Sequence, residues 1–461
     1  MSKDKTLEAL KKSLQDNLQS IQDRDKAELN EEQKKELKDV IEKVFMQALL
    51  DKGKPKDILA KVLKDKDEFL KIFNPWKNDE GKKLIKKFVD NINKSDSNIY
   101  FSWLDILNDD KQWEKSTSEE IKEEVKDKNK HVNMRYQIPT HFHGDIDNAV
   151  LFHCMENPRG YLGEWKDAQI DEEFAGASLE EFYIESANKR KEESKNIKDI
   201  IKERYKLNVV TTDSIKKIIY SDAKEDSPLR RELKNMFDEE ENFFEKKYIL
   251  KPNSNSKKPV LSEEYYYIAR YYAQLLDING ENLSKYNIKS NNKEEAQAEQ
   301  DKAFKISEKI CNVEIYPFSS SEPKLDGKGI GNTLLLNSDL SRLGAYIVLR
   351  RIYKYLEDYE KSNEKAYKPV FVFRKYDRAW EKLFDKIGVK DNFLQDLESH
   401  FFYCQTGQHG GGITSGNVIS IKNYKIYKDI FENLKQTAFE EISDVLRRGD
   451  IDKNSSGKSG D

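Results

Sequence analysis

The chain has 461 residues, of which 36% are charged and 37% hydrophobic, and 23 Tyr and 22 Phe rings add core-forming surface. This length exceeds what one typical core accommodates, so we expect two or three domains. A formal net charge of only −4 excludes a global positive field that would draw the chain onto nucleic acid. Any such binding must therefore use a local basic patch.

Residues 1–130 are predicted to form a helical N-terminal domain. Helical periodicity with dense Lys and Glu mixing runs over residues 32–48 and 57–73 and is broken at residues 74–76. These charge runs are typical of solvated helix faces. Neither the opening residues nor any later run approaches the roughly 18 apolar residues of a membrane span. This pattern indicates a soluble, cytoplasmic protein.

The three cysteines stand singly within apolar runs, as Cys154, Cys311 and Cys404. This placement is typical of reduced thiols in a core, rather than of a disulfide framework or a four-cysteine metal cluster. Cys404 lies close in sequence to His409, so a nucleophilic role is the alternative for this thiol. Its apolar strand favours a buried thiol instead.

Short apolar runs alternate with helical patterns in the second part of the chain. The pattern predicts strands over residues 149–155, 311–315, 369–373 and 400–404. It predicts helices over residues 338–359, 377–387 and 424–448. Alternation of this kind favours an α/β domain over residues 131–448, a three-layer sandwich with a four-stranded parallel sheet between helices.

A long, mostly helical insertion interrupts this alternation after the first strand. It covers residues 166–305 and includes a tyrosine-rich stretch at residues 263–276. We expect this insertion to sit above the sheet. The polar tail, residues 449–461, is expected to be disordered.

Polar, aromatic or glycine-rich residues follow every predicted strand. These segments are residues 157–161, 316–320, 374–376 and 405–412. Open α/β folds bind ligands at the carboxyl edge of their sheet, so all four segments would face one crevice. We therefore expect an active site at this edge.

Residues 139–163 read PTHFHGDIDNAVLFHCMENPRGYLG, in which an apolar run stops abruptly at Glu156-Asn157-Pro158. This stretch resembles the first motif of the uracil-DNA glycosylase superfamily, most closely the Asn-Pro-Gly version of its mismatch-specific and thymine-DNA branches. Arg159 stands where that family usually has glycine. The resemblance covers residues 136–160 and 311–447 and none of the N-terminal domain.

Cleavage of an N-glycosidic bond requires a water positioner, a donor to the departing base and a stacking platform. The resemblance implies that Asn157 holds the attacking water and that His409 donates to the base carbonyl. The family's His-Pro-Ser is replaced here by Gln408-His409-Gly410-Gly411-Gly412. Glu156 and Glu164 match no family position, but a carboxylate so near Asn157 can stabilise the sugar cation or act as a base.

Base recognition and DNA contact involve further residues at the strand ends. Tyr161 and Phe318 are candidates for stacking on a flipped base, and Ser319 and Gln408 for recognising it. The expected DNA-binding residues are Arg159, Arg374, Lys375, Arg378, Gly410, Gly411 and Gly412. Their basic side chains would supply the local phosphate footprint, or alternatively they are solvated helix faces.

The resemblance thus implies a monofunctional DNA glycosylase that removes a flipped uracil-like or modified base by hydrolysis, with no metal and no organic cofactor. A modified base in foreign DNA is one hypothesis, because the superfamily includes prokaryotic enzymes that act on invading phage genomes. The alternative is a non-catalytic module that binds nucleic acid or a protein on the same fold. A nucleotide-processing enzyme on the same kind of sheet is a third possibility.

Several motifs also have simpler interpretations. Asn157-Pro158 alone is typical of an ordinary strand-ending turn, residues 316–321 of a structured turn, and residues 410–412 of a flexible loop as much as a phosphate cradle. His141 and His143 have no second pair at zinc-ligand spacing, so no metal site is predicted. Residues 327–332 lack the Gly-Lys-Ser/Thr ending of a phosphate-binding loop and are expected to form a plain loop.

Overall fold

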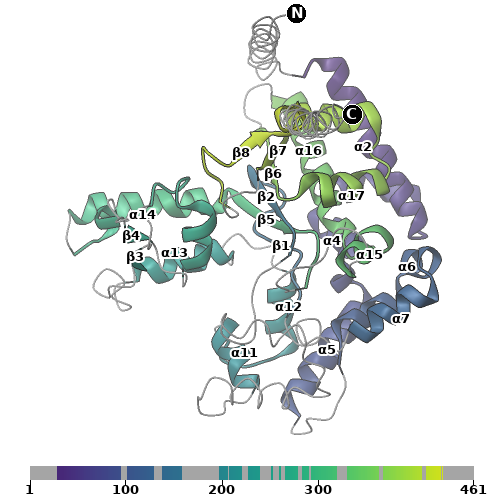
Figure 1. Cartoon of the computed structure of the whole chain (residues 1–461), viewed down its shortest axis with the longest axis horizontal. Helices are drawn as coiled ribbons and strands as arrows, with labels where there is room; N and C mark the ends of the chain where they lie inside the picture. Colours follow the sequence, from purple (N-terminus) through teal and green to yellow (C-terminus); the bar gives the residue numbers. More distant parts are fainter. Residues whose placement is uncertain are drawn as a thin grey trace, which may run out of the picture.

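The protein is built around a six-stranded mixed sheet in the order β1-β5-β2-β6-β7-β8 (Figure 1). The computed structural model describes residues 29–94, 101–128, 138–157, 197–205, 207–220, 227–238, 251–252, 259–260, 265–278, 283–289, 292–318, 330–362, 367–406, 412–426 and 428. The strands of this sheet are β1 (Phe142–His143), β2 (Leu151–Met155), β5 (Ile310–Glu314), β6 (Val370–Phe373), β7 (Phe402–Gln405) and β8 (Val418–Ser420).

The four central strands coincide with the four predicted ones. β2 pairs in parallel with β5 and β6, and β6 pairs in parallel with β7. β1 and β8 pair antiparallel at the two edges, so the mixed α/β class is confirmed but the sheet is neither four-stranded nor wholly parallel. With two and three residues, β1 and β8 are too short to leave a periodic signal in the sequence.

Helices make up most of the described chain outside the sheet. Those preceding β2 are α2 (Glu31–Asp51), η1 (Lys56–Ile58), α3 (Leu59–Lys64), α4 (Lys66–Phe73), η2 (Pro75–Lys77), α5 (Asp79–Asn93), η3 (Trp103–Asp109), α6 (Lys111–Ser116) and α7 (Glu119–Lys128). Those between β2 and β5 are α11 (Ile197–Tyr205), α12 (Thr212–Tyr220), α13 (Pro228–Phe237), η7 (Ile268–Tyr272), η8 (Leu283–Tyr286) and α14 (Lys293–Glu308). Those after β5 are α15 (Ile330–Asn337), α16 (Arg342–Ser362), η9 (Tyr376–Trp380), α17 (Glu381–Lys386) and α18 (Asp391–His400).

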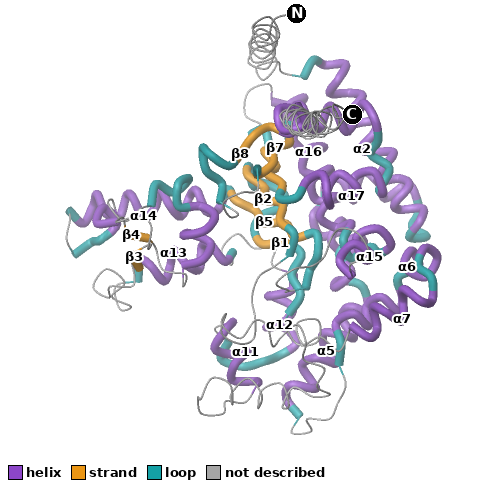
Figure 2. Tube along the Cα trace, viewed as in Figure 1, coloured by secondary structure: helices purple, strands orange, loops and turns teal. Residues whose placement is uncertain are grey.

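Both faces of the central strands are buried by helices (Figure 2). Phe152 of β2 and Phe371 of β6 enter one hydrophobic cluster, which they share with α2, α5 and α16. Met155 and Val372 enter a second cluster with Tyr272 and the helices α13 and α14. A strand that is apolar on both sides reads as a continuous apolar run, which is why these strands are visible in the sequence.

The N-terminal helices share the larger of these clusters with the α/β part. Phe73 of α4 lies 5.4 Å from Phe45 of α2 and 4.7 Å from Tyr346 of α16, measured between ring centroids. Aromatic pairs at these separations add to the free energy of area burial. Aromatic side chains thus join the N-terminal helices to α16. The division of the chain into domains stays a prediction.

The helix expected over residues 57–73 is broken into η1, α3 and α4. The carboxylate of Asp65 accepts hydrogen bonds from the N–H groups of Asp67 and Glu68, at 2.9 and 3.1 Å, and so caps a new helix. The break expected at residues 74–76 is present, because the Asn74 side chain accepts from Trp76 N–H at 3.0 Å and begins η2. Residues 330–332 begin α15 rather than continuing a loop.

The described part of the insertion packs in two places. α11 and α12 lie against α5, whereas α13, η7 and α14 cover the sheet face that carries Met155 (Figure 1). The insertion also contains a short hairpin of β3 (Lys251–Pro252) and β4 (Pro259–Val260). Of the described insertion, α13, η7 and α14 therefore lie over the sheet as expected, whereas α11 and α12 do not. The amphipathic helix α12 buries Ile215 and Ile219 beside the N-terminal helices instead.

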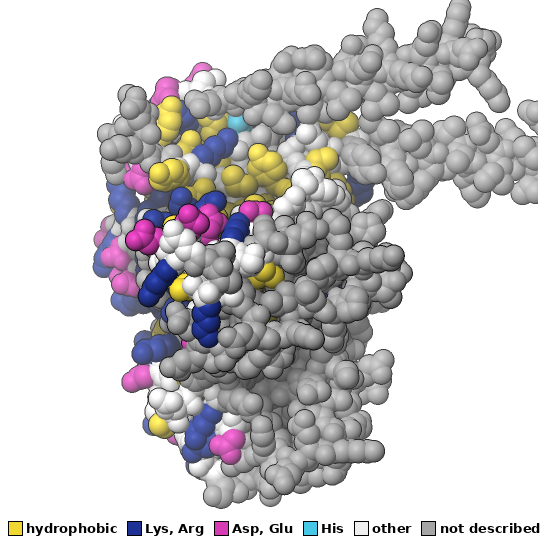
Figure 3. Space-filling model, turned by 90° about the vertical axis from the view of Figure 1, so that its left-hand side faces the viewer, with side chains coloured by type: hydrophobic (Ala, Val, Ile, Leu, Met, Phe, Trp, Pro, Cys, Tyr) yellow, Lys and Arg dark blue, Asp and Glu magenta, His cyan; other side chains and the backbone are white. Residues whose placement is uncertain are grey.

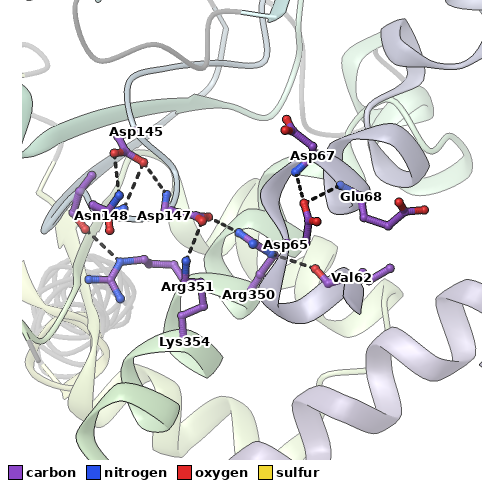
Figure 4. Close-up of polar contacts among 11 residues, drawn as sticks. Val62, Asp65, Asp67, Glu68, Asp145, Asp147, Asn148, Arg350, Arg351 and Lys354 are labelled. Carbon is purple, nitrogen blue, oxygen red and sulfur yellow. Dashed lines mark hydrogen bonds and ion pairs between the residues drawn. The ribbon is translucent and has the colours of Figure 1, made fainter. Parts of the chain in front are cut away.

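A buried ion pair joins three parts of the fold (Figure 4). Arg350 of α16 is fully buried; its Nη1 donates to Asp147 in the loop before β2, and its Nε donates to the Val62 carbonyl of α3 at 3.1 Å. Lys354 donates to the other Asp147 oxygen at 2.6 Å. Burial alone would raise the pKa of Asp147, but hydrogen bonds and charge from Arg350 and Lys354 outweigh it and lower that pKa.

We predict that Asp147→Ala lowers the free energy of unfolding by about 3–5 kcal/mol, because it leaves the Arg350 guanidinium buried without its anion. Urea unfolding followed by far-UV circular dichroism measures this change. Asp79→Ala removes the partner of Lys82 in a pair whose side chains are both exposed, and it serves as the control, with an expected effect below about 0.5 kcal/mol. Equal losses in the two variants would contradict a special role for the Asp147 pair.

Candidate active site

The carboxyl ends of β2, β5, β6 and β7 bring polar side chains from four parts of the chain together. Glu156 follows β2, Glu314 ends β5, Arg374 follows β6 and Gln405 ends β7. Parallel pairing continues beyond β2, because Tyr316 N–H donates to the Glu156 carbonyl and Arg374 N–H to the Cys154 carbonyl, both at 2.9 Å. The backbone therefore holds the first three ends in register, and this is the edge at which open α/β folds bind ligands.

Glu156 lies between two cations. Its carboxylate oxygens are 3.8 Å from Arg374 Nη2 and 3.7 Å from Lys375 Nζ. The side chains of Arg374 and Lys375 are 21% and 37% exposed, so both cations remain in reach of a ligand from outside. Lys375 has a left-handed backbone with φ of 47°. Such conformations are sparsely populated by non-glycine residues and often occur at functional sites.

Glu314 is a second carboxyl group at the same edge, in a very different environment. It pairs with Met155, the residue before Glu156, and its side chain is 0% exposed. Neither of its carboxylate oxygens accepts a hydrogen bond from any described residue. Burial raises the pKa of Glu314 to about 8; the charge of Arg374 lowers it and that of Glu156 raises it further. Glu314 is therefore mostly protonated at pH 7.

His153 connects three strands and the insertion by a chain of hydrogen bonds. Its Nε2 lies 3.2 Å from Gln405 Nε2, and its Nδ1 lies 3.0 Å from the Tyr272 hydroxyl. The Tyr272 hydroxyl donates to Asn312 Oδ1 of β5. Because the Gln405 amide can only donate here, the network assigns the proton of His153 to Nδ1. Burial, and then the charge of Arg374, lower the pKa of His153 to about 3, so the ring is neutral.

A tyrosine-rich segment of the insertion covers this edge. Its π-helical turn η7 is held by Glu232, whose carboxylate accepts the N–H groups of Tyr267 and Ile268, both at 2.9 Å. The Tyr271 hydroxyl donates to that of Tyr266 at 3.2 Å. Burial raises the pKa of Tyr271, while the positive charge of Arg374 acts in the opposite direction. Isolated π turns in helical segments are frequent at functional sites.

The last strand-end loop packs on the same segment. Ile413 N–H donates to the Tyr271 carbonyl at 2.9 Å. A Cβ atom at Gly412 would lie 2.8 Å from the Arg270 carbonyl oxygen, and the Gly412 carbonyl accepts from Asn417 Nδ2 at 2.8 Å. Close backbone packing thus gives one reason for glycine at position 412, whose predicted contact with DNA stays a prediction.

The other predicted site residues fall into three groups. Asn157 is buried directly after Glu156 at this edge, and Arg378 lies on η9 just beyond Arg374 and Lys375. Phe318 is 0% exposed and packs edge-on against Trp76 and Tyr316, so its ring is covered by the core rather than open to a base. Arg159, Tyr161, Glu164, Ser319, Gln408, His409, Gly410 and Gly411 lie outside the described residues.

Sequence reasoning missed the most unusual residue of this edge. Glu314 is a polar residue within the predicted strand 311–315, and no neighbouring residue in the sequence distinguishes it from a residue that faces solvent. The tyrosine-rich stretch at residues 263–276 is visible in the sequence as part of the insertion, but no local pattern assigns it to the site. Its two groups, Tyr265-Tyr266-Tyr267 and Tyr271-Tyr272, are the available signal, because aromatic pairs this dense need a partner surface.

The three cysteines are buried in the fold, and His141 is hydrogen-bonded within it. Cys154, Cys311 and Cys404 are free and buried, as predicted, and burial raises the pKa of Cys404 to about 12. His141 accepts from Trp76 Nε1 at 3.0 Å through Nδ1, and its Nε2 lies 2.7 Å from the Leu340 carbonyl. Within the described ranges, no group of three or more His, Cys, Asp or Glu side chains is arranged to hold a metal ion.

The described surface on one face of the molecule carries charges of both signs. On the face seen in Figure 3, Lys and Arg side chains are interspersed with Asp and Glu over the described part. A nucleic-acid ligand would therefore depend on local cations such as Arg374 and Lys375.

Comparisons with protein-family models, with curated proteins and with solved structures found no match to this chain. Among the described residues, no helix is both long enough and apolar enough to span a bilayer. Function is accordingly inferred from the residues at the strand ends.

We predict that Glu314→Gln stabilises the protein at pH 8 but hardly at pH 5. A folded-state pKa of about 8, against about 4.5 when unfolded, means that the folded state binds the extra proton between these values, so stability is lost as pH rises through this window. Glutamine is neutral at every pH, so the variant does not lose this stability. Urea unfolding at pH 5 and pH 8 measures the free energy of unfolding of both proteins. The control Glu357→Gln weakens contacts to Lys38 and Lys64 and should destabilise the protein at both pH values.

We also predict that the His153 ring does not titrate between pH 5 and pH 8. Its folded pKa of about 3 lies below the unfolded value of about 6.5, so the unfolded state binds the extra proton and stability is lost as pH falls below about 6.5. The loss is about 2 kcal/mol at pH 5. Nitrogen-15 NMR of the ring, assigned through His153→Asn, checks this, and a midpoint between pH 5 and pH 8 would contradict the neutral relay.

Proposed function

We propose that this chain is a DNA glycosylase that hydrolyses the N-glycosidic bond of a flipped uracil-like or modified base. The observation that supports this most is the presence of two carboxyl groups in unlike surroundings at the ends of adjacent parallel strands. Glu156 lies beside two cations, whereas Glu314 is buried and carries its proton. Pairs of carboxyl groups with such different environments divide acid and base roles in glycoside hydrolysis.

The anionic carboxylate suits the sugar side of the reaction. Bond cleavage develops positive charge on the sugar, and the Glu156 carboxylate is placed to stabilise it or to accept a proton from the attacking water. Asn157, the next residue, is the proposed holder of that water, as the resemblance to the glycosylase first motif implies. Arg374 and Lys375 lie within ion-pair distance of the Glu156 carboxylate and leave it less free to move.

Stacking and phosphate contact have candidates at the same edge. Tyr266 is half-buried, and its ring lies 5.3 Å between centroids from the buried ring of Tyr271, whose hydroxyl is close enough to Arg374 for that charge to act on it. Aromatic rings of this kind hold extruded bases. Arg374 and Lys375 retain exposed area through which they would meet a phosphate.

The order of the four parallel strands supports a glycosylase-like core within the larger sheet. The target that we propose is a modified base in foreign DNA, such as a phage genome, because the insertion and the altered motifs set this chain apart from enzymes for plain uracil. Excision of ordinary uracil with no activity on hypermodified DNA would contradict this target while leaving the reaction class intact.

We predict that the purified protein releases a base and leaves abasic sites in at least one DNA of a panel that includes uracil-containing and hypermodified phage DNA. Alkaline cleavage and mass analysis of the released base measure this. Asn157→Ala and Glu156→Gln should each lower turnover by roughly 10²–10⁴-fold with DNA binding largely kept. Glu357→Gln is a matched control, since it changes another ion-paired carboxylate, on α16, and should leave turnover unchanged.

The same experiment separates the enzyme from a non-catalytic binding module. A binding module predicts no release from any DNA that the protein binds, no effect of Asn157→Ala, and loss of binding when Arg374 and Lys375 are changed to Glu. The enzyme predicts the opposite ranking of these variants.

A further inference from the structure

We propose that Glu314 donates a proton to the departing base, so that the substrate is a base with a protonatable ring nitrogen, such as a purine, rather than one that leaves as an anion. This inference rests on the proposed glycosylase function and narrows its substrate class.

The position of Glu314 supports this role. It ends β5 opposite Met155, one residue before Glu156, and backbone bonds hold both sides, from Glu314 N–H to the His141 carbonyl at 2.6 Å and from Tyr316 N–H to the Glu156 carbonyl. Both carboxyl oxygens lack a hydrogen-bond partner within the described chain, although the side chain is fully buried. A buried polar group without a partner costs free energy, which a ligand at this edge would recover.

The neighbouring groups are poor sources of a proton. Arg374 stays charged, and burial raises the pKa of the Tyr267, Tyr272 and Cys154 groups well above neutrality. Glu156 is paired with cations, and the one ring proton of His153 faces the Tyr272 hydroxyl. Among these described groups, Glu314 alone combines a dissociable proton at neutral pH with unoccupied oxygens.

The proposed step balances as follows. The bond between C1′ and the base nitrogen breaks with its electron pair going to the base, and the Glu314 proton moves to a ring nitrogen of that base. Water attacks C1′ and gives its proton to Glu156. The products are a neutral base and an abasic site, and exchange with solvent restores the protons of both carboxyl groups. General acids of this kind contribute roughly 10²–10⁴-fold.

The test compares each base with a form that needs no proton. Five oligonucleotides of the same sequence carry guanine, adenine, hypoxanthine, uracil or 7-methylguanine at one fixed position. Abasic sites in each are counted after alkaline cleavage. 7-Methylguanine is already cationic and leaves as a neutral base. We expect the wild type to release a purine faster than uracil. Glu314→Gln should lower purine release by roughly 10²–10⁴-fold and leave 7-methylguanine release unchanged.

Two further measurements keep the result clear. The wild-type rate on the purine should fall as pH rises above about 8, while Glu357→Gln should match the wild type throughout. Glu314→Asp, which keeps the acid, should recover part of the rate if the variant protein folds as circular dichroism reports. Equal losses on guanine and 7-methylguanine, or a preference for uracil, would overturn the role of Glu314. No base release from any DNA would instead overturn the proposed function.

Discussion

The buried ion pair between Arg350 and Asp147 is the constraint on which the arrangement of this protein depends. Arg350 belongs to the long helix α16, Asp147 to the loop that enters the central strand β2, and the Val62 carbonyl to α3. A guanidinium that is fully buried must have its anion and its carbonyl in place, because an unpaired charge there is very costly. The pair therefore fixes the N-terminal helices, α16 and the start of β2 relative to one another.

The start of β2 in turn determines what happens at its end. A strand that begins at Leu151 reaches Glu156 in register with Tyr316 and Arg374, through direct backbone hydrogen bonds. Asp145 supports this start, because its carboxylate accepts the N–H groups of Asp147 and Asn148 and shapes the preceding turn (Figure 4). The ion pair at the amino ends of the parallel strands thus positions carboxyl groups at their carboxyl ends.

Burial of the polar groups in the candidate active site lowers the free energy of unfolding. The site holds a neutral histidine, a protonated glutamic acid and several tyrosine hydroxyls under a covering segment, and most of these groups lose solvation when the chain folds. The cost is tolerable because aromatic packing elsewhere is extensive, as between α2, α4 and α16. Stability that is given up at one place and recovered at another is typical of functional sites.

The amino-acid sequence determined the α/β alternation, the four central strands, the buried cysteines and the break at residues 74–76, because each leaves a local signal of periodicity, apolar runs or capping residues. It also indicated the edge that carries the candidate site, since a polar stretch after an apolar strand is a local pattern. Only the tertiary structure decided the short edge strands, the isolation of Glu314 and the covering of the site by Tyr266 and Tyr271. These depend on contacts between residues far apart in the chain, and no local pattern records which partner a buried group will lack.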